Sequence, residues 1–168
     1  MLSKSKLAPT LQLSQQFALD PLTTIAIRGV LSASAVRRWV QMAISDDDTA
    51  QTYAINLRWV DEAEGRALNH QHRGLGQDKD YATNVLTFEY GVDAGVLSAD
   101  IVLCWPVIVQ EAQAQGKLLR NHAAHLIIHG ALHALGYDHI EDDEAQAMEA
   151  LETKLLARLK IADPYAEC

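Results

Sequence analysis

Cysteine is scarce in this sequence, since the 168 residues contain only Cys104 and Cys168. Cys104 ends the apolar run Ile101–Cys104, which places it in the expected core, and Cys168 is the C-terminal residue. Two such cysteines support neither a disulfide framework nor a thiolate metal site. Any metal ion bound by this chain must therefore be held by nitrogen and oxygen ligands.

Long hydrophobic runs are also lacking. No apolar stretch approaches the roughly 20 residues that a membrane-spanning helix needs. Residues 1–20 are polar and mixed, without the apolar centre and small-residue cleavage site of a secretory signal. We therefore expect residues 1–20 to form a loosely ordered leader and residues 21–168 to form a single domain. We also expect the protein to be cytoplasmic, with no membrane partner.

Positive charge is in deficit, because 14 lysines and arginines face 22 aspartates and glutamates and give a net charge of −8. Binding to phosphates needs neutralising cations, so this balance argues against a protein that coats nucleic acid without sequence preference. The balance does not exclude a local basic groove.

The hydrophobic pattern predicts a mixture of strands and helices. Residues 52–60 alternate apolar and polar side chains, as expected of a half-buried strand. Further strands are predicted at 23–30, 85–90 and 100–104, and helices at about 33–44, 62–70, 106–116, 118–135 and 142–160. The helix over 118–135 is apolar nearly all round and should be buried. These elements predict an α+β fold in which a small mixed sheet of about four strands is packed with helices around one central helix.

Three histidines indicate a metal site on that central helix. His129 and His133 are four residues apart, so their side chains project from one face. His139 follows Gly136, a residue that can end the helix and reverse the chain, which would bring His139 back as a third ligand. Three neutral nitrogens suit one Zn²⁺ ion and leave a fourth position open for water, as in catalytic zinc sites.

Two alternatives concern the ligands and the metal. A set made of His125, His129 and His133 spans about 12 Å along a helix, so one ion cannot easily touch both ends. We expect His122 and His125 to be structural, or to lie around the site or its groove. Nickel, cobalt and copper accept imidazole ligands as zinc does.

The spacing H-x-x-x-H-x-x-G-x-x-H also occurs in metzincin proteases. Gly130, however, stands where those enzymes carry their glutamate general base. Without that carboxylate the chain lacks the proton acceptor of peptide hydrolysis. The pattern therefore favours the metal site but not a protease.

The histidine motif and several other segments resemble the YbeY family of bacterial endoribonucleases, also called rRNA maturation factors. The motif is HGALHALGYDH at 129–139, followed by IEDDEA at 140–145, and the other similar segments are 68–73, 79–88, 99–104 and 111–117. The resemblance covers about residues 50–165.

The resemblance implies a zinc-dependent endoribonuclease that cleaves single-stranded RNA in maturation of small-subunit ribosomal RNA and in ribosome quality control. Its expected partners are ribosomal RNA and the ribosome or its small subunit, and no DNA substrate is expected. Residues 21–168 would be the catalytic domain, with His129, His133 and His139 as zinc ligands and Arg73 as the catalytic arginine.

Two departures from the family pattern lie near Arg73. Residues 74–78 make a longer loop, which leaves Arg66 as an alternative arginine, and His72 replaces an expected aromatic residue. Because the net charge is acidic, an RNA substrate requires a narrow positive groove, which we expect between His139 and Arg73. No residue is an obvious general base, although Asp138 could orient a ligand imidazole.

Two other functions stay open at this point. One is a non-enzymatic ribosome-associated factor whose zinc pins the last helices, and the other is a metallohydrolase of another substrate, such as a small phosphoester. A vacant coordination position favours an enzyme, whereas a fourth protein ligand favours a structural role.

Overall fold

A computed structural model describes residues 7–73, 80–138 and 140–166, with only the backbone of Arg73. These residues form four strands, β1 (Thr10–Ala18), β2 (Thr52–Val60), β3 (Val85–Asp93) and β4 (Val96–Cys104). They also form six helices, α1 (Pro21–Val30), α2 (Ala33–Ile44), α3 (Glu62–Arg73), α4 (Trp105–Ala114), α5 (Leu119–Ala134) and α6 (Asp142–Arg158). The predicted α+β class is confirmed.

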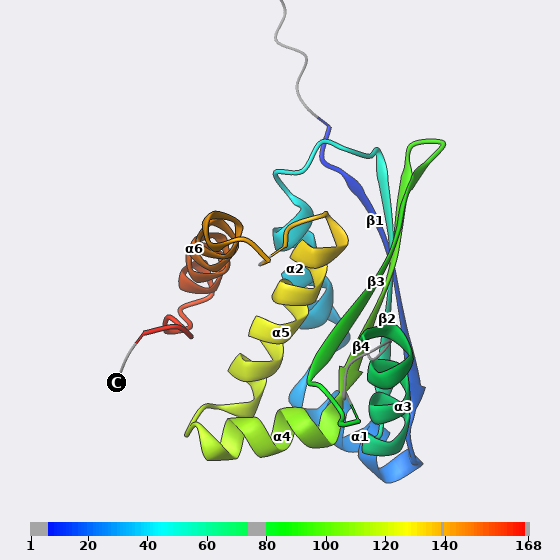
Figure 1. The fold of residues 1–168 in the computed structure, drawn as a ribbon, viewed down its shortest axis with the longest axis vertical. Helices are drawn as coiled ribbons and strands as arrows, with labels where there is room; N and C mark the ends of the chain where they lie inside the picture. Colours follow the sequence, from blue (N-terminus) through cyan, green and yellow to red (C-terminus); the bar gives the residue numbers. More distant parts are fainter. Residues whose placement is uncertain (1–6, 74–79, 139, 167–168) are drawn as a thin grey trace, which may run out of the picture.

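The four strands make one mixed sheet in the order β1-β2-β4-β3 (Figure 1). The pairs β1–β2 and β2–β4 are parallel, whereas β3 runs antiparallel to β4. The antiparallel pair is the predicted hairpin, with Gly91 and Gly95 in left-handed backbone conformations near its turn. Strand β3 is last in the strand order and is therefore an edge strand.

The expected leader is wrong for residues 10–18, which form the edge strand β1. Leu11 is buried and pairs with Tyr53 in the parallel register, while Ser14 on the other face donates a hydrogen bond of 2.9 Å to Asn56 Oδ1. An edge strand with one wet face keeps alternate polar side chains. Its mixed composition therefore reflects a half-exposed strand and not disorder.

The predicted strand at 23–30 is also wrong, because these residues belong to α1. Asp20 caps this helix by accepting a hydrogen bond of 2.9 Å from the backbone N–H of Thr23, and Pro21 follows at the first helical position. A carboxylate cap and a proline at this place strongly favour a helix start. This local signal outweighs the β-branched composition of the segment.

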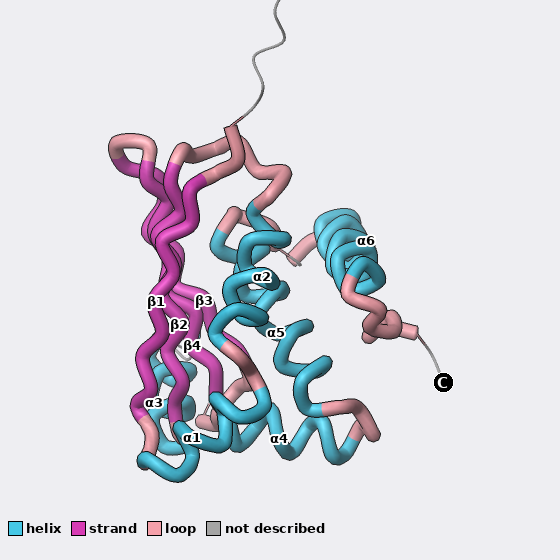
Figure 2. The backbone as a smooth tube through the Cα atoms, turned by 180° about the vertical axis from the view of Figure 1, so that it is seen from behind, coloured by secondary structure: helices cyan, strands magenta, loops and turns pink. Residues whose placement is uncertain are grey.

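The helices lie on both faces of the sheet. Helices α2 and α5 cover one face, with α6 outside α5, and α3 lies against the opposite face (Figures 1 and 2). The central helix α5 is buried for most of its length, as predicted. The elements packed around α5 therefore fix the direction in which each of its side chains can point.

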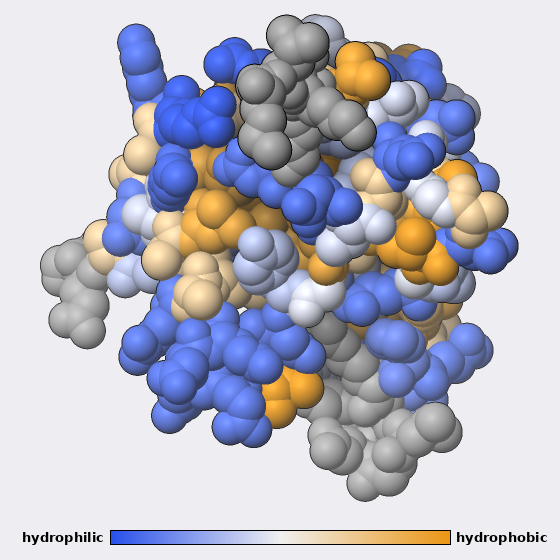
Figure 3. All heavy atoms as spheres, turned by 90° about the horizontal axis from the view of Figure 1, so that it is seen from above, coloured by the Kyte–Doolittle hydropathy of each residue, from blue (hydrophilic) through white to orange (hydrophobic). Residues whose placement is uncertain are grey.

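The outer surface is mixed in character. Hydrophilic residues and smaller hydrophobic areas alternate over the face that is seen from above (Figure 3). Within the described ranges, no helix combines the length and the apolarity that a membrane crossing requires.

Helix α5 approaches the sheet closely at Gly130. A Cβ atom at this position would lie 2.7 Å from Ile101 Cγ2 and 3.1 Å from Val85 Cγ2. The Thr87 hydroxyl donates a buried hydrogen bond of 3.1 Å to the Gly130 carbonyl. A glutamate here would be driven into β3 and β4, so the residue that separates this motif from the protease motif is required by packing.

We predict that Gly130→Ala lowers the free energy of unfolding by about 1–2 kcal/mol, because overpacking against the fully buried Ile101 outweighs the gain in helix propensity. The measurement is urea unfolding in a chelating buffer. The matched control is Gly29→Ala in α1, where a Cβ meets nothing within 4 Å. This control should gain about 0.5–1 kcal/mol. Equal stability of Gly130→Ala and wild type would contradict the packing argument.

Candidate metal centre

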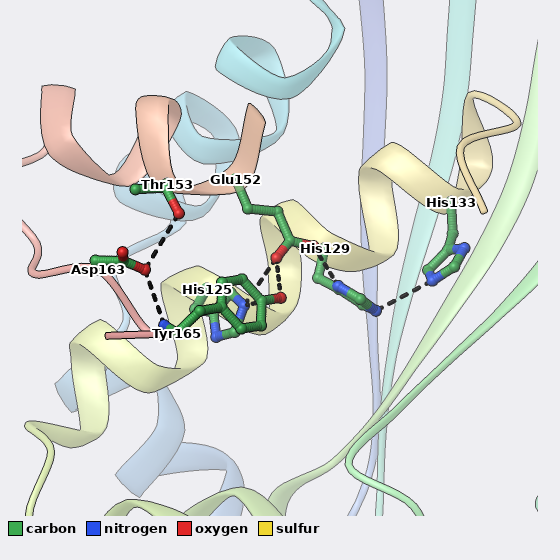
Figure 4. A network of polar contacts seen from close by, with 7 residues as sticks. All are labelled: His125, His129, His133, Glu152, Thr153, Asp163 and Tyr165. Atoms are coloured by element: carbon green, nitrogen blue, oxygen red, sulfur yellow. Dashed lines mark hydrogen bonds and ion pairs between the residues drawn. The ribbon is translucent and has the colours of Figure 1, made fainter. Parts of the chain in front are cut away.

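Two of the predicted ligands converge on the same face of α5. His133 is buried and His129 is half-buried, and their Nε2 atoms lie 3.1 Å apart (Figure 4). Two nitrogens at this separation require a shared proton or a shared cation between them. Two ligands on a tetrahedral zinc ion, each about 2.0–2.1 Å from the metal, are separated by roughly 3.3 Å. The observed pair therefore fits a common metal ion.

Glu152 of α6 fixes the protonation of one of these imidazoles. Its carboxylate oxygen Oε1 makes a very short contact with His129 Nδ1. A carboxylate can only accept this bond, so Nδ1 carries a proton; in the neutral ring the lone pair is then on Nε2. A carboxylate behind a histidine in this way is a recurrent feature of metal sites, because it orients the ring and raises its basicity.

The Glu152 carboxylate is fully buried and accepts two further hydrogen bonds. His125 Nε2 donates to Oε2 at 3.2 Å, and the Tyr165 hydroxyl donates to the same oxygen over a very short distance. Burial raises the pKa of Glu152, but the bonds from His125, His129 and Tyr165 outweigh burial and lower the pKa to about 2. Glu152 is therefore a carboxylate at neutral pH despite having no exposed surface.

The segment after α6 holds Tyr165 in this position. Asp163 Oδ1 accepts a hydrogen bond of 2.8 Å from the backbone N–H of Tyr165 and one of 3.2 Å from the Thr153 hydroxyl (Figure 4). Burial and the negative charge of Glu152 raise the pKa of Tyr165, which keeps its hydroxyl protonated as a donor. A hollow of about 370 Å³ lies beside His129 and Glu152, between α5 and α6.

His125 belongs to the Glu152 network and does not join His133. The structure groups His125, His129 and Glu152, with ligand atoms within 4.8 Å of one another, as residues that could hold a metal ion. In this group both carboxylate oxygens already accept hydrogen bonds from the two imidazoles. The ring of His125 is directed to Glu152, whereas the ring of His129 turns its Nε2 atom to His133.

His122 is part of a separate structural network. Its Nε2 donates a hydrogen bond of 2.8 Å to Glu111 Oε2, and Asn84 Nδ2 donates to the same oxygen at 3.0 Å. Burial lowers the pKa of His122 in spite of the nearby Glu111 carboxylate. This network ties α4 and α5 to the start of β3, away from the His129–His133 pair.

The chain reverses after α5 in the predicted manner. Gly136 has a positive φ of 99°, its N–H bonds the His133 carbonyl at 3.0 Å, and the N–H of Tyr137 bonds the Leu132 carbonyl at 3.2 Å. Asp138 then lies near Glu89 of β3, whose pKa is raised by burial and by the charge of Asp138. His139, the predicted third ligand, lies outside the described residues.

Arg73 ends α3, and its side chain is likewise outside the description. The preceding residue, His72, packs on Phe88 of β3 with ring centroids 4.5 Å apart, which anchors the end of α3 on the edge strand. Thr87, which bonds Gly130, points to the other face of the same strand. The end of α3 and the Gly130 turn of α5 thus meet the same short stretch of β3 from opposite faces.

Arg66, the alternative arginine, is engaged elsewhere. Its Nε and Nη2 atoms each donate a hydrogen bond of 2.6 Å to the carboxylate of Asp80. This bidentate pair raises the pKa of Arg66 and lowers that of Asp80.

Glu152 and Tyr165 are the site residues that sequence reasoning missed. One signal for Glu152 was present: it stands four residues after Met148 and three before Leu155 on the apolar face of α6. A charged residue on a buried helix face needs a partner. Its neighbours His125 and His129 are more than twenty residues away in sequence, so the partner could not be read locally.

Comparisons with known proteins agree with the motif. The model of the family described as Endoribonuclease YbeY matches residues 24–160. A relative from Ralstonia nicotianae named Endoribonuclease YbeY is 50% identical over 159 residues, covering 94% of this chain and 80% of that protein. A relative of the same name from Bordetella pertussis is 56% identical over 136 residues, covering 77% of this chain and 84% of that protein.

A solved structure supports the fold. The solution structure of TM1509 from Thermotoga maritima has a TM-score of 0.53 and 22% sequence identity, and the match covers 94% of this chain and all of that chain. Together with the family match over most of the sequence, these relatives confirm the resemblance, and this chain belongs to the Endoribonuclease YbeY family.

Proposed function

We propose that this chain is a zinc-dependent endoribonuclease that cleaves single-stranded RNA during maturation and quality control of the small ribosomal subunit, in the cytoplasm. The observation that carries the proposal is the pair of Nε2 atoms of His129 and His133, 3.1 Å apart, with a buried carboxylate behind one of them. Membership of a family of endoribonucleases supports RNA as the substrate, and the role in ribosomal RNA follows from that family.

We assign His129, His133 and His139 as the ligands of the metal. The His129–His133 pair supports this set over His125, His129 and Glu152, because the oxygens of Glu152 are already taken by N–H donors. The reversal at Gly136 sends the chain back from the end of α5, which supports a third ligand from the following segment. When bound, zinc supplies Lewis-acid stabilisation of a phosphodiester and activates water near neutral pH.

The chain's own residues have separable tasks in this proposal. Glu152 retains the proton at His129 Nδ1, so that Nε2 presents a lone pair. Arg73 binds a phosphate of the substrate through its bidentate guanidinium. The contact of His72 with Phe88 supports this role, because it anchors the end of α3 on the edge strand whose other face contacts α5 at Gly130. Peptide hydrolysis is disfavoured, since packing excludes a glutamate at position 130.

The direct test is cleavage of a single-stranded precursor ribosomal RNA by purified protein. We expect cleavage that is lost on chelation, restored by zinc and absent in His133→Ala, because this substitution removes one of the two converging nitrogens. Equal cleavage by wild type and His133→Ala would reveal a contaminating nuclease. If the zinc-loaded wild type cleaves no RNA but still binds ribosomes, the result would favour a non-enzymatic binding factor over an enzyme.

We predict that Glu152→Gln weakens zinc binding about 10- to 100-fold, because an amide cannot hold the Nδ1 proton of His129 as a carboxylate does. Affinity is measured by competition with a chromophoric chelator. The control is Glu149→Gln, an exposed residue of α6 beside the same hollow, which should leave the affinity unchanged. Unfolding curves of the metal-free proteins separate loss of affinity from loss of fold. Unchanged zinc affinity in a folded Glu152→Gln protein would refute the orienting role.

We predict that Arg73→Gln lowers the cleavage rate about 100-fold or more, as expected for loss of a group that stabilises transition-state charge. Zinc affinity should not change. Arg66→Gln is the matched variant, since Arg66 is paired with Asp80 and should leave the rate within about twofold. The opposite pattern, with a larger loss for Arg66→Gln, would transfer the assignment to Arg66.

A further inference from the structure

A hollow on the helical side of the molecule is lined by four cationic side chains and no acidic one. It has a volume of about 220 Å³ and lies between α2, the start of α5 and the end of α6. Its cations are Arg38, Arg120, Arg158 and Lys160. They are four of only fourteen lysines and arginines in a chain with a net charge of −8. The hollow thus concentrates positive charge, although the chain as a whole is negative.

Within the described part of the chain, no carboxylate pairs with these cations. Among the described residues, none of the four makes an ion pair, whereas Arg58 and Arg66 pair with Glu64 and Asp80. All four are exposed, and like charges that share a hollow repel one another. An anion from outside the chain would remove this repulsion.

Local helix electrostatics explain only half of the cluster. Arg158 and Lys160 are at the C-terminal end of α6, where the helix dipole favours cations. Arg120 is in the first turn of α5, where the dipole disfavours a cation, and Arg38 is in the body of α2. The sequence thus brings two cations from other helices to the end of α6 without a local reason.

Two features show that the hollow is built and not incidental. The Arg120 guanidinium lies over the ring of the buried Trp39, 5.1 Å from its centroid, which holds this cation in place. Lys160 has a positive φ of 60°, a backbone conformation that favours glycine or asparagine at the end of a helix. Lys160 adopts this backbone conformation at a conformational cost, and it lines the hollow.

We propose that this hollow binds a phosphate group, namely a backbone phosphate of the RNA substrate outside the metal centre. This inference rests on the proposed function. Arg120 precedes His129 by nine residues of α5, which is about 13.5 Å along the helix axis and half a turn around it, so the two side chains project from opposite faces of α5. An RNA strand that is cleaved at the histidines would therefore have to pass round α5 or α6 to place a flanking phosphate in the hollow.

The test compares RNA binding by Arg38→Gln/Arg158→Gln with binding by Arg28→Gln/Lys154→Gln, which has the same net charge but changes cations outside the hollow. A labelled, unstructured single-stranded RNA is titrated with the chelated protein at several salt concentrations. Loss of one phosphate contact should make the slope of log affinity against log salt shallower by about 0.7 and weaken binding about fivefold at 0.1 M salt. With zinc present, the hollow variant should raise KM by a similar factor and leave kcat unchanged.

Equal affinity and salt slope for the hollow variant and the charge-matched control would overturn the proposal. A second titration with inorganic pyrophosphate distinguishes the source of the phosphate. Pyrophosphate binding that disappears in the hollow variant, with RNA binding unchanged, would also overturn the RNA assignment and indicate a free phosphate ligand. Failure of the proposed function looks different: the wild type would cleave no RNA even where the hollow variant weakens RNA binding.

Discussion

The buried carboxylate of Glu152 is the group on which the geometry of the metal centre depends. A charge without exposed surface costs several kcal/mol unless hydrogen-bond donors replace water. Its donors come from His125 and His129 on α5 and from Tyr165 after α6. All three are available only when α5, α6 and the C-terminal segment are docked together. Formation of the site and docking of the last helix are therefore one event.

Neighbouring residues of the central helix α5 contribute to the candidate site and to the hydrophobic core. His129 and His133 point their Nε2 atoms at each other, while Gly130 between them faces the sheet. The absence of a side chain at Gly130 allows α5 to lie against β3, and Thr87 secures the contact by bonding the Gly130 carbonyl. The same edge strand receives the end of α3 on its other face. Close packing at one residue thus fixes how near α5 lies to the edge strand.

The sequence predicted most reliably the elements in which a single pattern dominates. The alternation of 52–60 and the apolar run of 118–135 correspond to β2 and α5. Residues 10–18 were misread because their strand partner lies some forty residues away and their outer face is polar. Residues 23–30 were misread because a cap at Asp20 outweighs β propensity.

The site was predictable to a similar degree. The i, i+4 spacing of His129 and His133 placed their nitrogens together, because both belong to one helix. The carboxylate behind them was not predictable, since Glu152 reaches His129 only through the packing of α6 on α5. Local spacing therefore predicts which histidines of one helix lie together, and tertiary packing brings the carboxylate that bonds to one of them.

The net charge misleads for a related reason, because it averages over regions that an RNA strand meets separately. Charges separated by more than a Debye length, about 8 Å at physiological salt, act independently. Helix α6 carries Asp142, Asp143 and Glu144 in its first turn and Arg158 in its last, an arrangement that the helix dipole favours at both ends. The acidic start of α6 adds to the negative net charge of the chain. Its basic end lies in the hollow with Arg38 and Arg120. An acidic chain can therefore present a local field suited to phosphate without a change in its overall composition.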